Sequence, residues 1–287
     1  MDYVRSFNLR KSCIQQLVRD ALREDIGKRD ITTTAIIPKD KYIEAILLAK
    51  ENCVICGLNI ARDVFRSQNK NIKFKPRVSD GQKIKKGKIV AYISGKAQGI
   101  LTAERVALNF LSLLSGVATK TRVYVDKVKP YKVRILDTRK TIPGLRELEK
   151  YAVRTGGGYN HRMRLDEMLL IKDNHLKILD RREELPKVNR NYKLEIEVKN
   201  LREFKKILGL RPDIIMLDNM SIKEMRKAVR IRNNLSPKFH RPIPHLEASG
   251  GVNLRNVKKV AATGVDMISV GELTHSLASI DISLEIL

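Results

Sequence analysis

The stretch LEIEVKNLREFKKILGLRPDIIML, residues 194–217, decides the fold class because it holds one complete strand–helix–strand unit. Its two short apolar runs, Leu194–Val198 and Ile214–Leu217, predict buried strands. Between them, residues 201–208 carry apolar side chains at helical spacing. Strands that alternate with helices are typical of parallel strands joined by crossover helices.

The same rhythm recurs through the second half of the chain. Further strands are predicted at Val133–Leu136, Met168–Ile171, His245–Ala248 and Val265–Val270, and further helices at Lys223–Ile231 and Leu254–Ala262. Six strands in the second half of a 287-residue chain predict a small closed α/β barrel rather than an open sheet.

The first 110 residues or so lack this rhythm, which predicts a separate α+β domain. Residues 9–25 have helical spacing and end before Gly27. Residues 43–60 and 72–93 are expected to form strands and turns. A long helix is expected from Thr102 to Val117, with Thr102 as its N-cap.

Composition narrows the class of protein. The net charge is +25, from 57 Lys and Arg against 32 Asp and Glu. A solvated basic surface is the first interpretation, steering of anionic substrates the second and nucleic-acid binding the third. Aromatic residues do not interleave with the basic runs as a nucleic-acid stacking surface requires. We therefore expect no nucleic-acid partner.

No secretory or membrane segment is expected. No apolar run approaches the ~18–20 residues that span a bilayer, and residues 1–20 have charges throughout. These features predict a cytoplasmic protein without a membrane partner. The cysteines Cys13, Cys53 and Cys56 are too few for a disulfide framework, and the Cys53–Cys56 pair is interpreted as packed apolar residues.

Polar residues follow each predicted strand at once, as in a barrel whose active site lies at the carboxyl ends of its strands. Several of these residues are cations that suit a ligand with more than one negative charge. The expected positive lining consists of Arg105, Arg139, Lys140, His161, Arg162 and Lys172. The glycine run at 156–158 is expected to be a mobile loop that carries His161 and Arg162 inward.

Two further groups complete the predicted site. Glu197 and Asp218 end adjacent strands and suit Mg²⁺ or ribose hydroxyls, although a salt bridge to a nearby cation is the alternative. The Ser249-Gly250-Gly251 turn precedes a helix expected from Leu254, and a second glycine loop covers 271–275. Paired loops after the last two strands of a barrel recur as phosphate sites.

These motifs together resemble the quinolinate phosphoribosyltransferase family. The matching stretches run across nearly the whole chain and keep the family's order: EDIGKRDITT (24–33), LTAERVALNFLSLLSGVAT (101–119), ILDTRKTIPGLRELEKYAVRTGGGYNHR (135–162), LIKDNH (170–175), EIEV (195–198), MLDNM (216–220), LEASGGV (246–252) and ISVGELTHS (268–276).

The resemblance implies an N-terminal α/β sandwich domain over residues 1–112, to which residues 276–287 return, and a C-terminal α/β barrel over residues 113–275. It implies a homodimer or a larger oligomer of dimers, in which one subunit's N-terminal domain covers the other's barrel. The implied reaction joins quinolinate to 5-phosphoribosyl-1-diphosphate with Mg²⁺ as the cofactor. The implied products are nicotinate mononucleotide, diphosphate and carbon dioxide.

The resemblance also implies roles for individual residues. The quinolinate carboxylates would be held by Arg105, Arg139, His161, Arg162 and Lys172. Lys140 would contact the phosphoribosyl donor, with Thr138 beside it, and Lys140, Lys172 and Arg139 are the expected catalytic residues. Glu197 and Asp218 would face ribose and Mg²⁺. The 5′-phosphate would be held by Ser249, Gly250, Gly251, Val270 and Gly271, with His275 nearby.

The chain departs from the family pattern at two positions. Lys50 stands where the family has an arginine that reaches the neighbouring subunit's site, and lysine keeps the charge but lacks the bidentate fork. Cys53 stands where the family has glycine, which suggests a different turn.

Other functions remain open at this point. A relative acting on nicotinate would need one carboxylate pocket rather than two, and another relative is encoded beside molybdenum transport genes. A basic nucleic-acid-binding protein that reuses the scaffold would show strongly salt-dependent binding. The set of Arg105, Arg139 and Arg162 favours a dicarboxylate.

Overall fold

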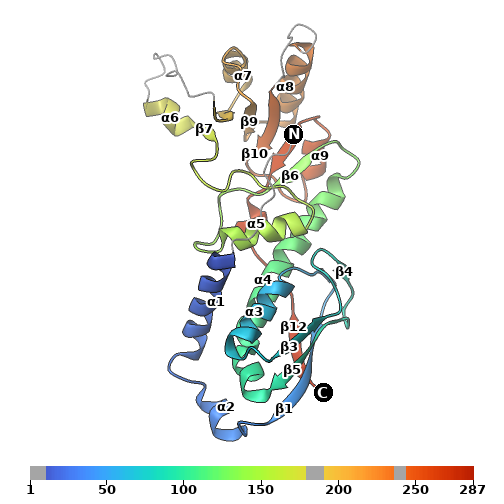
Figure 1. The fold of residues 1–287 in the computed structure, drawn as a ribbon. Coiled ribbons are helices and arrows are strands. Elements are labelled where there is room, and N and C mark those ends of the chain that lie inside the picture. Colours follow the sequence, from blue (N-terminus) through green and yellow to red (C-terminus); the bar gives the residue numbers. More distant parts are fainter. Residues whose placement is uncertain (1–10, 179–190, 236–243) are drawn as a thin grey trace. The chain divides into compact units, whose positions relative to one another are not determined.

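The computed structural model describes residues 11–178, 191–235 and 244–287 (Figure 1). The chain divides into two compact units, with one boundary between Arg122 and Val123. The barrel unit comprises Val123–Arg146 and Gly158–His275, and the sandwich unit comprises residues 11–122 with Glu147–Gly157 and Ser276–Leu287.

The barrel unit is built on a six-stranded parallel sheet in the order β6-β11-β10-β9-β8-β7. Its strands are β6 (Arg134–Leu136), β7 (Leu169–Ile171), β8 (Leu194–Val198), β9 (Ile214–Asp218), β10 (His245–Ser249) and β11 (Met267–Ser269). Each lies where the apolar pattern predicts a strand, so the α/β barrel class is confirmed.

Closure of the barrel is incomplete among the described residues. β6 and β7 stand at the two ends of the sheet order, and no strand ladder joins them. On its other side, β6 pairs only through a single parallel β-bridge between Leu136 and Tyr159 in the part of the chain that the structure describes. The expectation of a fully closed barrel was therefore wrong, because the segment before His161 occupies the edge that a closing strand would need.

The helices of the barrel unit follow its strands. They are α6 (Asp173–Ile178), α7 (Leu201–Leu208), α8 (Ile222–Leu235), α9 (Val257–Ala261) and α10 (Glu272–His275). α7 shows why the local sequence forms a helix. Asn200 caps it by accepting a hydrogen bond from the Glu203 N–H (3.0 Å), while Phe204 and Ile207 are buried on one face.

The sandwich unit has an antiparallel sheet in the order β12-β1-β5-β3, with a small β2-β4 pair beside it. The strands are β1 (Tyr42–Ala49), β2 (Cys53–Val54), β3 (Lys73–Pro76), β4 (Lys83–Ile84), β5 (Ile89–Lys96) and β12 (Ile282–Ile286). β12 pairs with β1, so the chain's last residues lie in the same sheet as its first strand. The helices are α1 (Lys11–Ile26), α2 (Ile31–Ile36), α3 (Leu58–Gln68), α4 (Ala97–Val128) and α5 (Arg146–Thr155).

α4 is longer than its sequence pattern predicts, and Thr102 is not its N-cap. The helix begins five residues earlier, at Ala97, and continues to Val128. The Thr102 hydroxyl donates instead to Asp30 (3.0 Å), which itself caps α2 by accepting from the Thr33 N–H. By length and composition α4 could cross a membrane, but 61% of its most apolar window is buried, which marks it as a core helix.

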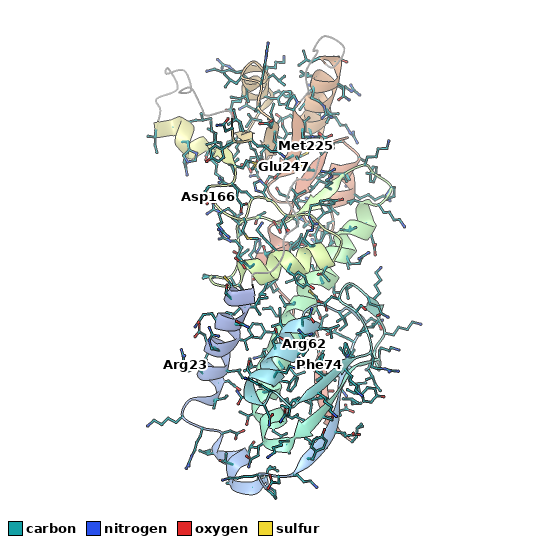
Figure 2. The ribbon with its side chains drawn as sticks, in the orientation of Figure 1. Arg23, Arg62, Phe74, Asp166, Met225 and Glu247 are labelled. Atoms are coloured by element: carbon teal, nitrogen blue, oxygen red, sulfur yellow. The ribbon has the colours of Figure 1, made fainter. Side chains whose placement is uncertain are left out.

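α3 is one of the helices that the sequence pattern did not predict. Gly57 is its N-cap, with a φ of 105° that suits glycine, and the N–H groups of Gly57 and Leu58 donate to Asp80 (3.0 and 3.2 Å). The cap therefore comes from a distant part of the chain. Phe74 of β3, labelled in Figure 2, packs against Phe65 of α3 with ring centroids 6.2 Å apart.

The two inner cysteines are packed residues, as predicted. Cys53 and Cys56 are both buried and both free. Burial raises the pKa of the Cys53 thiol to about 11 and that of Cys56 well above its usual value. These thiols therefore stay protonated, which fits a packing role.

Gly156, the first residue of the glycine run at 156–158, is tightly packed, whereas a mobile loop was expected there. A Cβ on Gly156 would lie 2.5 Å from the Ala118 carbonyl oxygen and 2.6 Å from the Thr121 Cβ. Gly156 is buried against α4, so glycine is needed there for close packing.

Replacing Gly156 by alanine is expected to destabilise the protein by about 1–3 kcal/mol, because the added methyl group overpacks against backbone. Urea unfolding of the whole chain measures this. Gly209→Ala is the control, since Gly209 has right-handed helical dihedrals and its Cβ would meet Lys206 at an ordinary 3.4 Å. Equal midpoints for the two variants would contradict the packing role.

Candidate active site

The carboxyl ends of the parallel strands surround a cavity of about 770 Å³ within the barrel unit. Strands that run in parallel end at one edge, so the residues after them meet there. The structure brings the following predicted residues to the wall of this cavity: Thr138, Arg139, Lys140, His161, Arg162, Lys172, Glu197, Asp218, Ser249, Gly250, Gly251, Gly271 and His275.

Arg139 and Arg162 form the cationic centre of the cavity. Each has a buried Nε atom without a hydrogen-bond partner among the described residues. Burial lowers the pKa of Arg162, and the charge of Arg139 lowers it further. A guanidinium donates two parallel hydrogen bonds to a carboxylate. Two adjacent guanidinium groups with unused donors therefore suit an anion with more than one carboxylate.

The loop after β6 is held rigid from both sides. Buried Asp137 accepts hydrogen bonds from the His161 N–H (2.9 Å) and the Asn160 side chain. The Thr274 hydroxyl donates to the carbonyl of Lys140 (2.7 Å), and the Lys140 N–H donates to Thr138 (3.0 Å). Lys140 is thus fixed at its backbone while its exposed side chain remains able to meet a ligand.

Arg146 supports the same loop from beneath. Its guanidinium donates to the Thr141 hydroxyl (3.0 Å), the Arg139 carbonyl (3.3 Å) and the Met163 carbonyl (3.2 Å). These bonds connect the loop after β6 to the segment that carries Arg162. Arg146 therefore acts on the two cavity arginines through their backbone.

Glu197 and Asp218 form an acidic pair on the neighbouring strands β8 and β9. Burial raises the pKa of Glu197, the charge of Asp218 raises it further, and Lys172 opposes the shift. Two adjacent carboxylates that repel each other suit a hard cation with oxygen ligands. Mg²⁺ commonly takes one or two carboxylates and completes its shell with substrate phosphates and water, so these residues fit it.

Two glycine turns close the cavity. Gly250 and Gly251 have φ values of 86° and 61°, and the adjacent Asn219 also has positive φ, with its N–H donating to the Ser249 carbonyl (2.9 Å). A Cβ on Gly271 would meet the His275 ring at 3.0 Å and the Lys140 side chain at 3.5 Å. This second turn therefore lies against Lys140.

One expectation for the phosphate site was wrong. The helix predicted from Leu254 begins at Val257, because Asn253 and Asn256 hold the intervening residues in a turn (2.9 Å). Val270 is buried and its N–H donates to the Leu136 carbonyl (2.9 Å). Its expected contact with a phosphate stays a prediction, which another atom of the residue would have to make.

Gly250→Ala is expected to weaken binding of the phosphate-bearing substrate by about tenfold. The added Cβ would lie 2.4 Å from the Asn219 side chain, and its φ of 86° disfavours any residue with a Cβ. Calorimetric titration with ribose 5-phosphate measures the effect. Gly144→Ala is the control, since it has a similar φ of 82° but open space at its Cβ. Equal affinity in the two variants would contradict the predicted role.

Two family models match the chain. The model for the N-terminal domain of quinolinate phosphoribosyl transferase covers residues 30–115, and that for the C-terminal domain covers residues 117–285. The chain belongs to the quinolinate phosphoribosyltransferase family.

Individual members of the family agree with this assignment. A Methanocaldococcus jannaschii relative, named a probable carboxylating nicotinate-nucleotide pyrophosphorylase, is 41% identical over 94% of this chain and 96% of its own length. The Mycobacterium leprae nicotinate-nucleotide pyrophosphorylase is 38% identical over 94% and 95%. The structure of the Francisella tularensis nicotinate-nucleotide pyrophosphorylase has a TM-score of 0.90, with 38% identity and 99% of both chains covered.

Two residues predicted for the quinolinate phosphoribosyltransferase site lie in the sandwich unit. Arg105 is exposed on α4. Lys50 forms an ion pair with Glu285 of β12 (2.5 Å) within its own unit. Their roles toward a substrate therefore stay predictions.

Several cavity residues escaped the sequence analysis of this quinolinate phosphoribosyltransferase member. Asn219, Glu247, Asn253, Ser269 and Glu272 all line the cavity. Glu272 accepts a hydrogen bond from buried Tyr124, a contact across 148 residues that no local pattern reveals. Glu247 had a usable signal, because it is a lone acid within the apolar run of β10.

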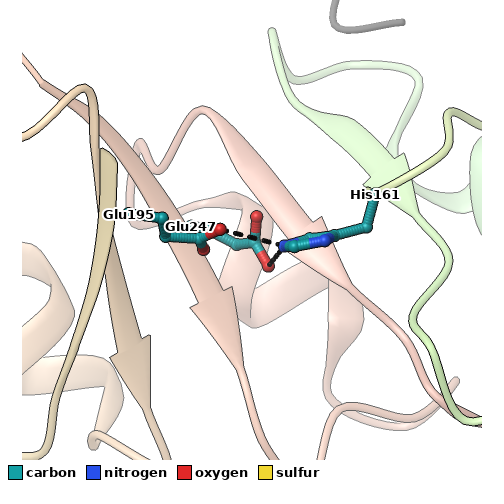
Figure 3. A group of neighbouring side chains, drawn as sticks. All are labelled: His161, Glu195 and Glu247. Carbon is teal, nitrogen blue, oxygen red and sulfur yellow. Dashed lines mark hydrogen bonds and ion pairs between the residues drawn. The ribbon is translucent and has the colours of Figure 1, made fainter. Parts of the chain in front are cut away.

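His161 is oriented by a buried acidic pair that the sequence analysis did not assign (Figure 3). Its Nε2 meets Glu195 at 3.0 Å, with Glu247 at 3.8 Å, and its Nδ1 accepts the Arg162 N–H at 2.8 Å. Because Nδ1 accepts, the proton of a neutral ring is on Nε2 and is donated to Glu195. Both ring nitrogens thus contact groups of the protein itself, and the expected contact of His161 with a substrate carboxylate stays a prediction.

Proposed function

We propose that the chain transfers the phosphoribosyl group of 5-phosphoribosyl-1-diphosphate to quinolinate and removes one carboxylate as carbon dioxide. The products are nicotinate mononucleotide and diphosphate, which places the enzyme in de novo NAD biosynthesis as a pentosyltransferase. The observation that carries the proposal is the pair of unpartnered arginine donors, Arg139 and Arg162, in a cavity that also holds two glycine turns. Family membership supports the same reaction.

Each part of the cavity has a distinct role in this reaction. Arg139 and Arg162, with Lys172 at the rim, bind the dicarboxylate and present its ring nitrogen to C1 of the ribose. Positioning two substrates in this way removes much of the entropic barrier to their reaction. The nitrogen attacks C1, diphosphate leaves with the bonding electrons, and Lys140 stabilises the charge that develops on it.

Loss of the 2-carboxylate follows from the charge on the ring. Attachment of ribose makes the ring nitrogen a cation. When the carbon–carboxylate bond breaks, its electron pair stays on C2 next to that cation, which stabilises it. No covalent enzyme intermediate is required.

Glu197 and Asp218 would hold Mg²⁺ together with substrate oxygens and water. The ion would neutralise the phosphates of the donor when it is bound. The proposed assembly is a cytoplasmic homodimer, or an oligomer of dimers, in which Lys50 acts on the site of the partner subunit. No nucleic-acid partner is proposed.

A relative that uses nicotinate is the second candidate for this fold. Nicotinate has a single carboxylate, which would leave one of the two guanidinium groups without a carboxylate partner and its buried Nε without an acceptor. The arginine pair therefore favours quinolinate.

The decisive experiment incubates the protein with 5-phosphoribosyl-1-diphosphate, Mg²⁺ and either quinolinate or nicotinate. Release of carbon dioxide and formation of nicotinate mononucleotide are expected with quinolinate. Product with nicotinate alone would overturn the proposal. Duplex DNA titrated at physiological salt tests the nucleic-acid alternative, for which no binding is expected.

A further inference from the structure

Glu247 is a buried acid in the wall of the cavity whose chemistry the binding roles above do not use. It lies on β10, and Glu195 lies on β8, with β9 between these two strands. Their side chains lie side by side (Figure 3). Its side chain is fully buried, yet it contributes to the cavity wall. Neither of its carboxylate oxygens has a hydrogen-bond partner in the described part of the chain. The Ser269 hydroxyl lies close enough to oppose the rise in the Glu247 pKa, although its own hydrogen bond, at 3.5 Å, is to the Ala248 carbonyl.

Such a carboxyl group is expected to be neutral. A buried carboxylate without donors costs several kcal/mol, so it takes up a proton instead. Burial raises the pKa of Glu247 well above its ordinary value, and the charge of Glu195 raises it further. His161 opposes the shift, but its Nε2–H is directed to Glu195 at 3.0 Å rather than to Glu247 at 3.8 Å.

The proposed reaction needs a proton for C2 of the ring, inside this cavity. When carbon dioxide leaves, C2 of the ring has an electron pair and must gain a proton to become the C–H of the product. Until it does, the same electron pair can recapture carbon dioxide. The guanidinium groups of Arg139 and Arg162 do not release protons at neutral pH. The Nε2–H of His161 is donated to Glu195.

We propose that Glu247 is the general acid that protonates C2 after decarboxylation, so that it acts in the second half of the reaction and not in phosphoribosyl transfer. The inference rests on the proposed function. The C2–carboxylate bond breaks, carbon dioxide leaves, and the electron pair on C2 takes the proton of the Glu247 carboxyl group. The Glu247 carboxylate then regains a proton from water when the product leaves.

The test compares two products of each turnover in Glu247→Gln, which keeps the shape of the side chain but has no acidic proton. Diphosphate and carbon dioxide are measured together, with chromatography of the nucleotides. Diphosphate release is expected to continue, while carbon dioxide release falls at least tenfold behind it and the dicarboxylate mononucleotide accumulates. Glu224→Gln, at a half-buried position of α8 outside the cavity wall, is the matched control and is expected to keep equimolar products.

A pH series on the unmodified protein tests the same inference without depending on the folding of a variant. The charged and titratable groups that face Glu247 are Glu195 on β8, Asp137 after β6, and His161 with its neighbour Arg162. Because the pKa of Glu247 is raised, the acid form is present at neutral pH and is lost as pH rises. The ratio of carbon dioxide to diphosphate is therefore expected to fall from one between pH 7 and 10.

The outcomes separate the inference from the function on which it rests. If the unmodified protein makes neither diphosphate nor nucleotide from quinolinate, the proposed reaction fails. If Glu247→Gln loses diphosphate and carbon dioxide in equal proportion, the residue has only a structural role and the inference is overturned. A ratio that stays at one through pH 10 overturns it as well, because solvent must then supply the proton.

Discussion

Lys140→Ala is expected to lower kcat by about 100- to 1000-fold, the loss typical when one preorganised electrostatic contact to a transition state is removed. The backbone of Lys140 is fixed by Thr274 and Thr138, and its side chain crowds against Gly271 of the second glycine turn. A cation held there stabilises charge as diphosphate leaves. The effect is therefore expected in kcat rather than in the KM for quinolinate.

Steady-state kinetics with quinolinate and 5-phosphoribosyl-1-diphosphate measure this prediction. Lys140 is exposed and makes no core contact, so the melting temperature of the variant is expected to match that of the unmodified protein. Lys259→Ala on α9 is the control, because it removes an exposed lysine of the same unit away from the cavity wall. Near-normal turnover in Lys140→Ala would remove Lys140 from the mechanism.

Arg139→Ala is expected to lower kcat/KM for quinolinate by about 100-fold or more. Each charge-assisted hydrogen bond contributes about 1.5–3 kcal/mol, and a guanidinium makes two to a carboxylate. Arg139 also neutralises negative charge on the substrate next to Arg162, whose pKa it lowers. Removing it therefore relieves repulsion in the empty cavity but leaves one substrate carboxylate unpaired.

The signature of this role is selectivity. The KM for quinolinate is expected to rise steeply in Arg139→Ala, while the affinity for 5-phosphoribosyl-1-diphosphate changes little, as competition or direct titration can measure. Arg226→Ala, at an exposed position of α8, is the matched control. An equal loss of affinity for both substrates would show that Arg139 supports the whole cavity rather than the dicarboxylate.

The strands and helices of the barrel unit were largely predictable from local sequence. The bounds of β8 and α7 agree with the apolar runs at 194–198 and 201–208. Burial on both faces makes a parallel strand a continuous apolar run, and this signal needs only neighbouring residues. The helix α3 was missed because its first N–H groups are capped by Asp80, 22 residues downstream of Leu58.

The candidate site was predictable to the extent that it follows strand ends. Cations after β6 and β7, acids at the ends of β8 and β9, and glycines after β10 were all placed at the cavity by that rule. The rule does not reveal which groups already have a partner. The N–H of Val270, at the position predicted to contact a phosphate, is bonded to the carbonyl of Leu136, 134 residues earlier in the chain.

By itself, the sequence determined the barrel class, the family and the residues that gather around the anion, because periodicity and strand-end chemistry are local properties. Tertiary structure alone decided how those residues are used. It turned His161 toward Glu195, left one donor each of Arg139 and Arg162 unpaired, and buried Glu247 without a hydrogen bond to its carboxylate among the described residues. The physical reason is that hydrogen bonding and desolvation depend on which groups meet in space, and these groups come from strands far apart in the chain.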